Sequence, residues 1–141
     1  MRRAIGAADL MPHLHPVRVY YEDTDLAGIV YYANHLRFIE RARTEWIRRL
    51  GVDQVALRAD HGIVFAVRRI EADYLSPAHF DDLLEVRTDL QLLAGARIQL
   101  VQDIWRGDLR LFASVVTLVA IGRDGRPVRL PDALRTQLSP A

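Results

Sequence analysis

The chain contains no cysteine, which excludes disulfide bonds, cysteine nucleophiles and thiolate metal sites. Lysine is absent as well, so all 19 basic residues are arginine. These arginines are spread along the chain, and the formal net charge is only +1. Domains that bind nucleic acid usually carry a basic patch or stripe. We therefore predict that this chain has no nucleic-acid partner.

Long hydrophobic runs are missing too. No stretch of 18 uncharged apolar residues occurs, and residues 1–15 lack an apolar core of signal-peptide length. We expect a protein that neither spans a membrane nor leaves the cell by a standard signal. The absence of cysteine fits a cytoplasmic location, although it is compatible with any compartment.

Several hydrolase and metal-site patterns are absent. None of the three serines, Ser76, Ser114 and Ser139, lies in a G-x-S-x-G elbow. The five histidines show no H-E-x-x-H spacing. A calcium loop beginning near Asp25 would need acidic residues where the chain has Ala27 and Asn34. We therefore predict no metal site and no cofactor.

The length of 141 residues predicts one domain, and the 50% hydrophobic content is enough for a core. Residues 1–14 show no clear periodicity and are expected to form a flexible arm. The folded domain is predicted for residues 15–132, followed by a polar tail at 133–141.

The periodicity of hydrophobic residues changes once along the chain. Residues 17–21 alternate as a strand does, and residues 32–50 repeat at helical spacing up to Gly51. A short second helix is predicted at 52–60. Four strands follow, at 63–74, 84–92, 96–105 and 109–121. The last is apolar on both faces, which is typical of a strand in the middle of a sheet or at a subunit interface.

One long helix and about five antiparallel strands have a simple packing solution. The helix lies on the concave face of a curled sheet and buries its apolar stripe there. This predicts an α+β fold with five to six strands around a central helix. Because such a sheet leaves its edges exposed, we expect at least a twofold-symmetric homodimer.

The segment from Tyr20 to Asn34 carries most of the functional information. It places an acidic turn, above all Asp25, a few residues before the start of the long helix. A helix N-terminus has unpaired N–H groups and a partial positive charge, so it can bind an oxyanion. A carboxylate beside such a site is the minimum equipment for hydrolysing an activated acyl group. Taken by itself, the local sequence favours a turn aspartate that bonds to its own backbone over a catalytic one.

Residues 20–38 resemble a known signature, Y-x-x-D-T-D-x-x-G-I-V-Y-Y-A-N-x-L-R-F, of the hot-dog-fold acyl-CoA thioesterases. The resemblance is closest to the 4-hydroxybenzoyl-CoA thioesterase family and its Tol–Pal-associated (YbgC-type) branch. It continues at residues 40–44, 68–74 and 77–88, and so covers about 16–131. It implies a hot-dog fold and hydrolysis of a short-chain or aromatic acyl-CoA. It also implies a homotetramer built from two dimers, and leaves acyl carrier protein as a possible partner.

The resemblance also implies roles for individual residues. Asp25 aligns with the catalytic aspartate, which attacks the thioester carbonyl or activates a water. The backbone N–H of Tyr32 corresponds to the donor for the thioester oxygen. The Tol–Pal branch usually has histidine at that position, so His35, one turn on, is a candidate to replace the imidazole in part. The predicted substrate-binding residues are Tyr21, Gly28, Ile29, Val30, Tyr31, His35 and, as a contact of the CoA nucleotide, Arg97.

Two other functions stay open at this point. A hot-dog dehydratase uses a histidine with an acidic partner on a differently built helix, and the segment shows no such arrangement. A hot-dog module could also bind acyl-CoA or acyl carrier protein without turnover. The intact Asp25 argues against that alternative, because a pure binder has no need of a carboxylate beside the thioester.

Overall fold

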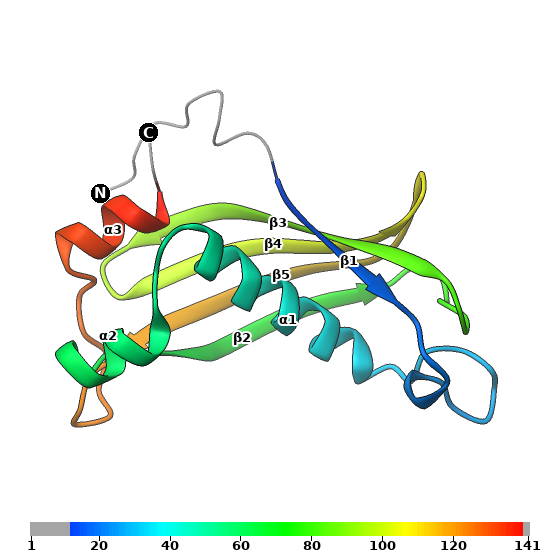
Figure 1. Cartoon of the computed structure of the whole chain (residues 1–141), viewed down its shortest axis with the longest axis horizontal. Coiled ribbons are helices and arrows are strands. Elements are labelled where there is room, and N and C mark those ends of the chain that lie inside the picture. The colour runs from blue at the N-terminus through cyan, green and yellow to red at the C-terminus, as the bar shows by residue number, and fades with distance from the viewer. Residues whose placement is uncertain (1–11, 140–141) are drawn as a thin grey trace.

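The computed structural model describes residues 12–139. Its centre is an antiparallel sheet with the strand order β1–β3–β4–β5–β2, so that β1 and β2 are the edge strands (Figure 1). The strands are β1 (His13–Arg18), β2 (Val64–Tyr74), β3 (Leu83–Ala94), β4 (Arg97–Arg106) and β5 (Leu109–Ile121). The helices are α1 (Asn34–Arg49), α2 (Gln54–His61) and α3 (Asp132–Leu138). This confirms the predicted α+β fold, with five strands in the sheet.

Helix α1 runs across one face of the sheet and supplies the centre of the core (Figure 1). Its 16 residues span about 24 Å at 1.5 Å per residue. Phe38, Ile39 and Ala42 are fully buried against the sheet. Leu36, which the helical periodicity placed on the buried stripe, is 37% exposed because the stripe is centred on Phe38 and Ala42 instead.

The concave face of the sheet contains one polar network among its apolar side chains. Gln102 on β4 is fully buried, and its Nε2 donates to the Ile39 carbonyl and to the Thr88 hydroxyl, both at 2.9 Å. Its Oε1 accepts a 2.9 Å hydrogen bond from the Arg43 guanidinium. The network ties α1 to the middle of the sheet and satisfies polar groups that would be costly to bury alone.

The N-terminal strand differs from the prediction for residues 17–21. β1 begins at His13 and ends at Arg18, whereas Tyr21–Asp23 form a 3₁₀ turn. The predicted arm therefore includes the first two residues of β1, and residues 1–11 of that arm lie outside the described residues. The alternation of Val17, Val19 and Tyr21 is misleading because local hydrogen bonds of the turn hold Tyr21.

The C-terminal segment also differs from the expected polar tail. From Asp132 it forms α3, whose Leu134 and Leu138 are buried in the core. With only seven residues, two of them buried, the helix is too short for its periodicity to stand out. The predicted division of the chain at residue 132 stays a prediction.

Strands β5 and β2 occupy different places in the sheet. β5, apolar on both faces, lies between β4 and β2, which agrees with the interior position predicted for it. β2 has β5 on one side only and leaves large side chains exposed, with Val67 46% and Tyr74 48% accessible. No helix in the described part of the chain is long and apolar enough to cross a membrane.

Candidate active site

The turn after β1 is held by its own polar side chains. The Asp23 carboxylate accepts a 2.8 Å hydrogen bond from the N–H of Tyr20. The Thr24 hydroxyl donates to the carbonyl of Tyr21 at 2.7 Å. Asp23 and Thr24 therefore shape the turn that presents the next residue, Asp25.

Hydrogen bonds hold the backbone of Asp25, whereas only one of its two carboxylate oxygens is hydrogen-bonded. Its N–H donates to the Ile29 carbonyl at 2.9 Å, and its carbonyl accepts from Gly28 N–H at 3.0 Å. Gly28 has a φ of 79°, in the left-handed region that favours glycine. Carboxylate oxygen Oδ1 accepts from Ala27 N–H at 2.9 Å, whereas Oδ2 has no hydrogen-bond partner among the described residues. The exposed side chain therefore offers one free acceptor oxygen.

The start of α1 provides two free donors. Tyr31 N–H donates to the Asp23 carbonyl at 2.9 Å, and Asn34 N–H donates to the Tyr31 carbonyl at 2.8 Å. No described residue accepts a hydrogen bond from the N–H of Tyr32 or from that of Ala33. These two groups add to the partial positive charge of the helix N-terminus, which favours an oxyanion.

The two tyrosines at the helix start lie beside the acidic turn. Tyr31 is 45% and Tyr32 63% exposed, and their ring centroids are 4.8 Å apart. The hydrogen bond with Tyr32 raises the pKa of the Tyr31 phenol, and the negative charge of Asp25 acts in the same direction. The carboxylate of Asp25 is therefore close enough to act electrostatically on this aromatic pair.

A second loop, residues 75–82, packs against the first. Val30 is buried, and its N–H donates to the Ala78 carbonyl at 2.8 Å. Ile29 forms a β-bridge with His79. Val30 thus anchors the loop of Asp25 in the core, and Ile29 joins that loop to residues 75–82. Both residues were predicted to bind substrate, and that role stays a prediction.

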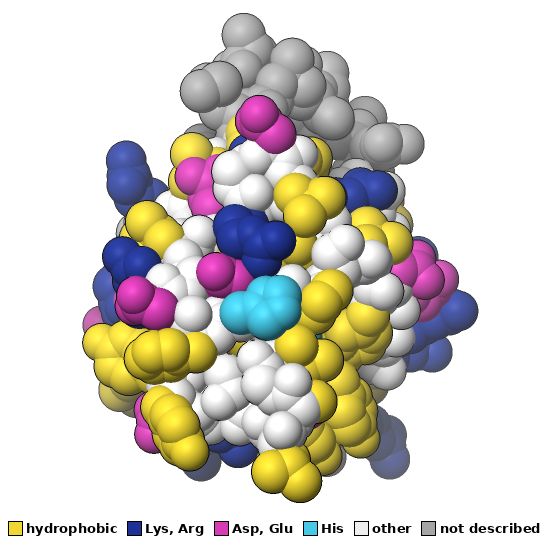
Figure 2. Space-filling view, turned by 90° about the vertical axis from the view of Figure 1, so that its right-hand side faces the viewer, with side chains coloured by type: hydrophobic (Ala, Val, Ile, Leu, Met, Phe, Trp, Pro, Cys, Tyr) yellow, Lys and Arg dark blue, Asp and Glu magenta, His cyan; other side chains and the backbone are white. Residues whose placement is uncertain are grey.

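Exposed aromatic side chains border the acidic turn. Tyr21 is 82% exposed and contacts Phe80 edge to face, with ring centroids 6.4 Å apart. Figure 2 faces the right-hand end of the molecule in Figure 1. On its lower half, hydrophobic side chains (yellow) lie around a patch of other side chains and backbone (white). Tyr21 is therefore a surface residue near Asp25, as expected for a pocket wall, and Phe80 was not foreseen.

The second loop is anchored by a charged cluster. The Asp82 carboxylate accepts from His79 N–H at 2.9 Å and from the Arg106 guanidinium at 2.7 Å. Burial opposes ionisation of Asp82, but these hydrogen bonds and the positive charge of Arg106 hold its pKa below the ordinary value. Asp82 is thus a charged anchor that positions the loop beside the turn of Asp25.

His35 lies in the core and not on the helix surface. Its ring is only 4% exposed and stacks on Phe112 at 5.2 Å. Its Nδ1 is 3.1 Å from the Tyr32 carbonyl oxygen, so the nitrogen there donates. Burial lowers the pKa of His35, and this favours the neutral ring. The predicted substrate contact and acid–base role gain no support from this position.

Sequence reasoning missed Tyr74. Its hydroxyl donates to the Tyr32 carbonyl at 2.7 Å, although 42 residues separate the two in the chain. Tyr74 ends a motif that carried the family resemblance, but no local pattern predicts contact with the start of α1. The contact arises because the end of β2 comes beside that helix terminus in the folded sheet (Figure 1).

The burial of His35 predicts a pH-dependent stability. Since the folded-state pKa of His35 lies below its ordinary value of 6.5, the unfolded chain takes up the proton first as the pH falls. We expect the free energy of unfolding contributed by this group to be constant above about pH 7 and to decline as the pH drops through 6.5. Urea unfolding at pH 8 and 5.5 should show a smaller loss in His35→Phe than in wild type. An equal loss in both proteins would contradict the buried neutral ring. Burial also lowers the pKa of His13. Part of the loss in unfolding free energy should therefore remain in both proteins.

Arg97 does not join the Asp25 site within one subunit. It begins β4 after a turn at Gly95, whose carbonyl accepts from Leu130 N–H. The Asp25 turn lies at the opposite end of the sheet (Figure 1), and β3, which connects the two ends, spans about 40 Å at 3.3 Å per residue. A contact of Arg97 with the same substrate would need a second subunit and stays a prediction.

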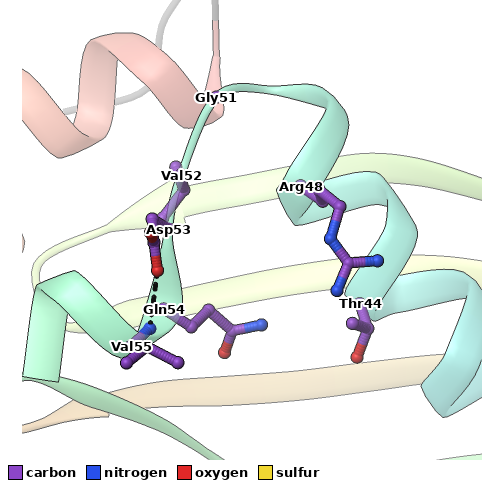
Figure 3. A pocket seen from close by; sticks show the side chains of 7 residues that line it. All are labelled: Thr44, Arg48, Gly51, Val52, Asp53, Gln54 and Val55. Carbon is purple, nitrogen blue, oxygen red and sulfur yellow. Dashed lines mark hydrogen bonds between the residues drawn. The ribbon is translucent and has the colours of Figure 1, made fainter.

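The described part of the chain also contains a cavity of about 370 Å³ between the end of α1 and the start of α2 (Figure 3). Thr44 and Arg48 line it from α1, and Asp53 and Gln54 line it from the α2 side. The Asp53 carboxylate is engaged with the first N–H groups of α2. This cavity lies at the far end of α1 from Tyr32, and no predicted site residue lines it.

Residues 12–139 bring no three histidine, aspartate or glutamate side chains together in a group suited to hold a metal. The site described above consists of one carboxylate, two free backbone N–H groups and an aromatic border. A carboxylate beside oxyanion donors can form or hydrolyse an acyl bond.

Residues 19–138 match the family model of the thioesterase-like superfamily. The chain belongs to this superfamily. The match includes both loops of the site, helix α1 and strands β2 to β5, whereas β1 lies before it. The predicted relationship with hot-dog thioesterases is confirmed.

Individual relatives agree with the superfamily. The chain is 40% identical over 121 residues to an acyl-CoA thioesterase YbgC of Haemophilus influenzae, covering 85% of this chain and 89% of that protein. A solved structure of a probable thioesterase from Bartonella henselae has a TM-score of 0.81 and 36% identity, covering 85% and 99% of the two chains. A 4-hydroxybenzoyl-CoA thioesterase in complex with its CoA thioester has a TM-score of 0.86 over 91% and 99%. At 21% identity, that last likeness concerns the fold alone.

Proposed function

We propose that this protein is an acyl-CoA thioesterase whose reaction takes place between the Asp25 carboxylate and the start of α1. The observation that carries the proposal is that one short hairpin, closed by the bridge between Thr24 and Val30, holds a free Asp25 carboxylate oxygen before its turn and leads into the unbonded Tyr32 N–H. The names of the thioesterase relatives support the reaction class, and the hydrogen-bond pattern of the turn supports Asp25 and Tyr32 as its site.

Tyr32 N–H binds the thioester oxygen in the proposed reaction and stabilises the negative charge that develops on it. Asp25 either attacks the carbonyl carbon or removes a proton from an attacking water. In the first route an acyl–Asp25 anhydride forms as CoA leaves, and water then hydrolyses it. In the second route water adds directly and the tetrahedral intermediate expels CoA. Both routes convert acyl-CoA and water into the free acid and CoA, and one free Asp25 oxygen suits either.

The acyl group is proposed to be short or aromatic. Tyr21, Tyr31, Tyr32 and Phe80 surround the acidic turn with exposed rings, which suit an aromatic or compact apolar acyl group. Tyr32 also stands where the Tol–Pal branch usually has histidine. The test is hydrolysis of a panel of short aliphatic, long aliphatic and aromatic acyl-CoAs, with free thiol measured. We expect the highest kcat/KM within the short and aromatic classes, and selectivity for long chains would contradict this part of the proposal.

The alternatives are less well supported. The similar proteins with named activity are thioesterases, and none of those compared above is described as a dehydratase or a binding module. A dehydratase histidine would have to reach the substrate, whereas His35 is buried under Phe112 and Tyr74. Tight binding of acyl-CoA without turnover would still favour a non-catalytic module.

We also propose that the active form is at least a homodimer, with a tetramer of two dimers as the expected assembly. A groove of about 570 Å³ runs between α1 and the edge strand β2. Its apolar lining comes from Leu36, Val67 and Ile70, and its charged lining from Arg37, Glu40, Arg41 and Arg43. A second copy pairing along β2 would cover both the groove and the open edge. In this arrangement the partner's strands would wall the pocket beside Asp25. A Tol–Pal association and an acyl carrier protein partner remain predictions from the resemblance, and a cytoplasmic location remains a prediction from the absence of cysteine.

A further inference from the structure

The carbonyl of Tyr32 lies just before α1, whose N-cap is Ala33. No backbone N–H of the described residues donates to it, since Leu36 N–H donates to the Ala33 carbonyl at 3.2 Å. The Tyr32 carbonyl accepts two side-chain donors, the Tyr74 hydroxyl at 2.7 Å and His35 Nδ1 at 3.1 Å. Side chains therefore supply the hydrogen bonds that this carbonyl accepts at the entrance to the helix.

Both donors are held by ring packing. Tyr74 meets His35 edge to face with centroids 5.0 Å apart, and it meets Phe112 at 5.0 Å. His35 stacks on the other side against Phe112. Such contacts restrict both side chains to one rotamer and aim the two donors at the same oxygen. The carbonyl has no hydrogen to offer, so it also selects the His35 tautomer that carries the proton on Nδ1.

Both groups keep their donor protons near neutral pH. Burial raises the pKa of the Tyr74 phenol, so that the hydroxyl stays protonated. Burial lowers the pKa of His35, so that the ring is neutral and its remaining nitrogen carries no charge. Neither group adds a formal charge beside the anion that develops in the reaction.

We infer that Tyr74 and His35 are positioning residues for the oxyanion site: together they clamp the Tyr32 carbonyl and so orient the free N–H of Tyr32. This inference rests on the proposed thioesterase function. The carbonyl and the N–H belong to the same residue, so fixing one restricts rotation of the other about the Tyr32 backbone. The two hydrogen bonds also polarise the peptide that ends in the free Ala33 N–H, which strengthens that donor. Neither side chain needs to touch the substrate.

Tyr74→Phe tests the inference because it removes one hydroxyl and keeps the ring packing. A loosened oxyanion donor affects the transition state more than bound substrate, so kcat should fall about tenfold while KM stays within about twofold. The thermal midpoint should remain close to that of wild type. Tyr20→Phe is the matched control, because Tyr20 is an exposed tyrosine outside this cluster, and it should keep wild-type kcat. A wild-type kcat in Tyr74→Phe, or a loss that appears only in KM, would overturn the inference.

A double-mutant cycle separates a shared clamp from two independent effects. His35→Phe removes the second donor and keeps an aromatic ring against Phe112. Each single variant retains one donor to the Tyr32 carbonyl, whereas the double variant leaves that carbonyl without either. The loss of kcat in the double variant should therefore exceed the product of the two single losses. A purely multiplicative loss would contradict a common target.

The outcome also separates this inference from the proposed function. If wild type hydrolyses acyl-CoA and Asp25→Asn does not, the function stands, and only the Tyr74 and His35 variants decide the clamp. If wild type hydrolyses no thioester, the proposed function fails. In that case the backbone N–H resonance of Tyr32 still reports on the clamp. It should shift in Tyr74→Phe and stay in place in Tyr20→Phe, and an unmoved resonance would refute the clamp.

Discussion

Asp25→Asn is expected to lower kcat for acyl-CoA hydrolysis by about 10³-fold, since a neutral amide can neither attack the thioester carbonyl nor accept a proton from water. The substitution should leave the fold intact. The amide oxygen can still accept the hydrogen bond that Ala27 N–H donates to Oδ1, and the side chain is exposed. KM should change little because the acyl-CoA keeps its other contacts. The measurement is steady-state thiol release at matched protein concentration.

Glu22→Gln is the control for Asp25→Asn. Glu22 is an exposed carboxylate in the same turn, three residues earlier, and forms no side-chain hydrogen bond with the described residues. Its variant loses the same charge and should retain wild-type kcat. Equal activity losses in the two variants would point to the net charge of the turn and would remove the specific role of Asp25.

Val67→Glu is expected to convert the assembly into a monomer and to lower turnover by about 10²-fold, the size of loss that a small misplacement at the site can cause. Val67 is 46% exposed on the free edge strand β2 and lines the groove beside α1. In a twofold-symmetric contact along β2, the two introduced carboxylates would repel each other and would have to be removed from water. Light scattering gives the mass, and circular dichroism checks that the monomer stays folded.

Leu14→Glu supplies the comparison for Val67→Glu. Leu14 is 52% exposed on β1, the opposite edge strand, so its variant introduces the same charge at an edge that the proposed dimer leaves free. It should retain both mass and activity. The outcome that contradicts a shared site is a fully active wild-type monomer. A charge on the interior strand β5 would be a poorer test, because Val116 there is fully buried and its replacement would test folding alone.

The fold was predictable where local physics decides it. Helix α1 follows from its periodicity, and it ends where Gly51 adopts a φ of 86°. β3 follows from its alternation, which fails only at the register shift between Leu90 and Leu92. The errors arose where short-range hydrogen bonds or two buried leucines outweighed the pattern, in the turn at Tyr21 and in α3.

The part of the candidate site that is close together in the sequence was predictable. Asp25, Gly28 and Tyr32 lie within one turn, so their roles could be proposed from order and spacing. Tyr74 and the burial of His35 depend on how β2 and β5 approach α1, which no single segment encodes. Sequence spacing likewise could not show that the end of the sheet with Arg97 is remote from Asp25 in the same subunit.

The most direct test of the central claim is a single-turnover experiment with enzyme in excess over an acyl-CoA that wild type binds. Quenched samples are assayed for intact thioester, free CoA and free acid. Wild type should convert all bound acyl-CoA to equal amounts of acid and CoA, whereas Asp25→Asn should hold it intact. Intact acyl-CoA on the wild-type protein, or equal release by the two proteins, would contradict hydrolysis at Asp25.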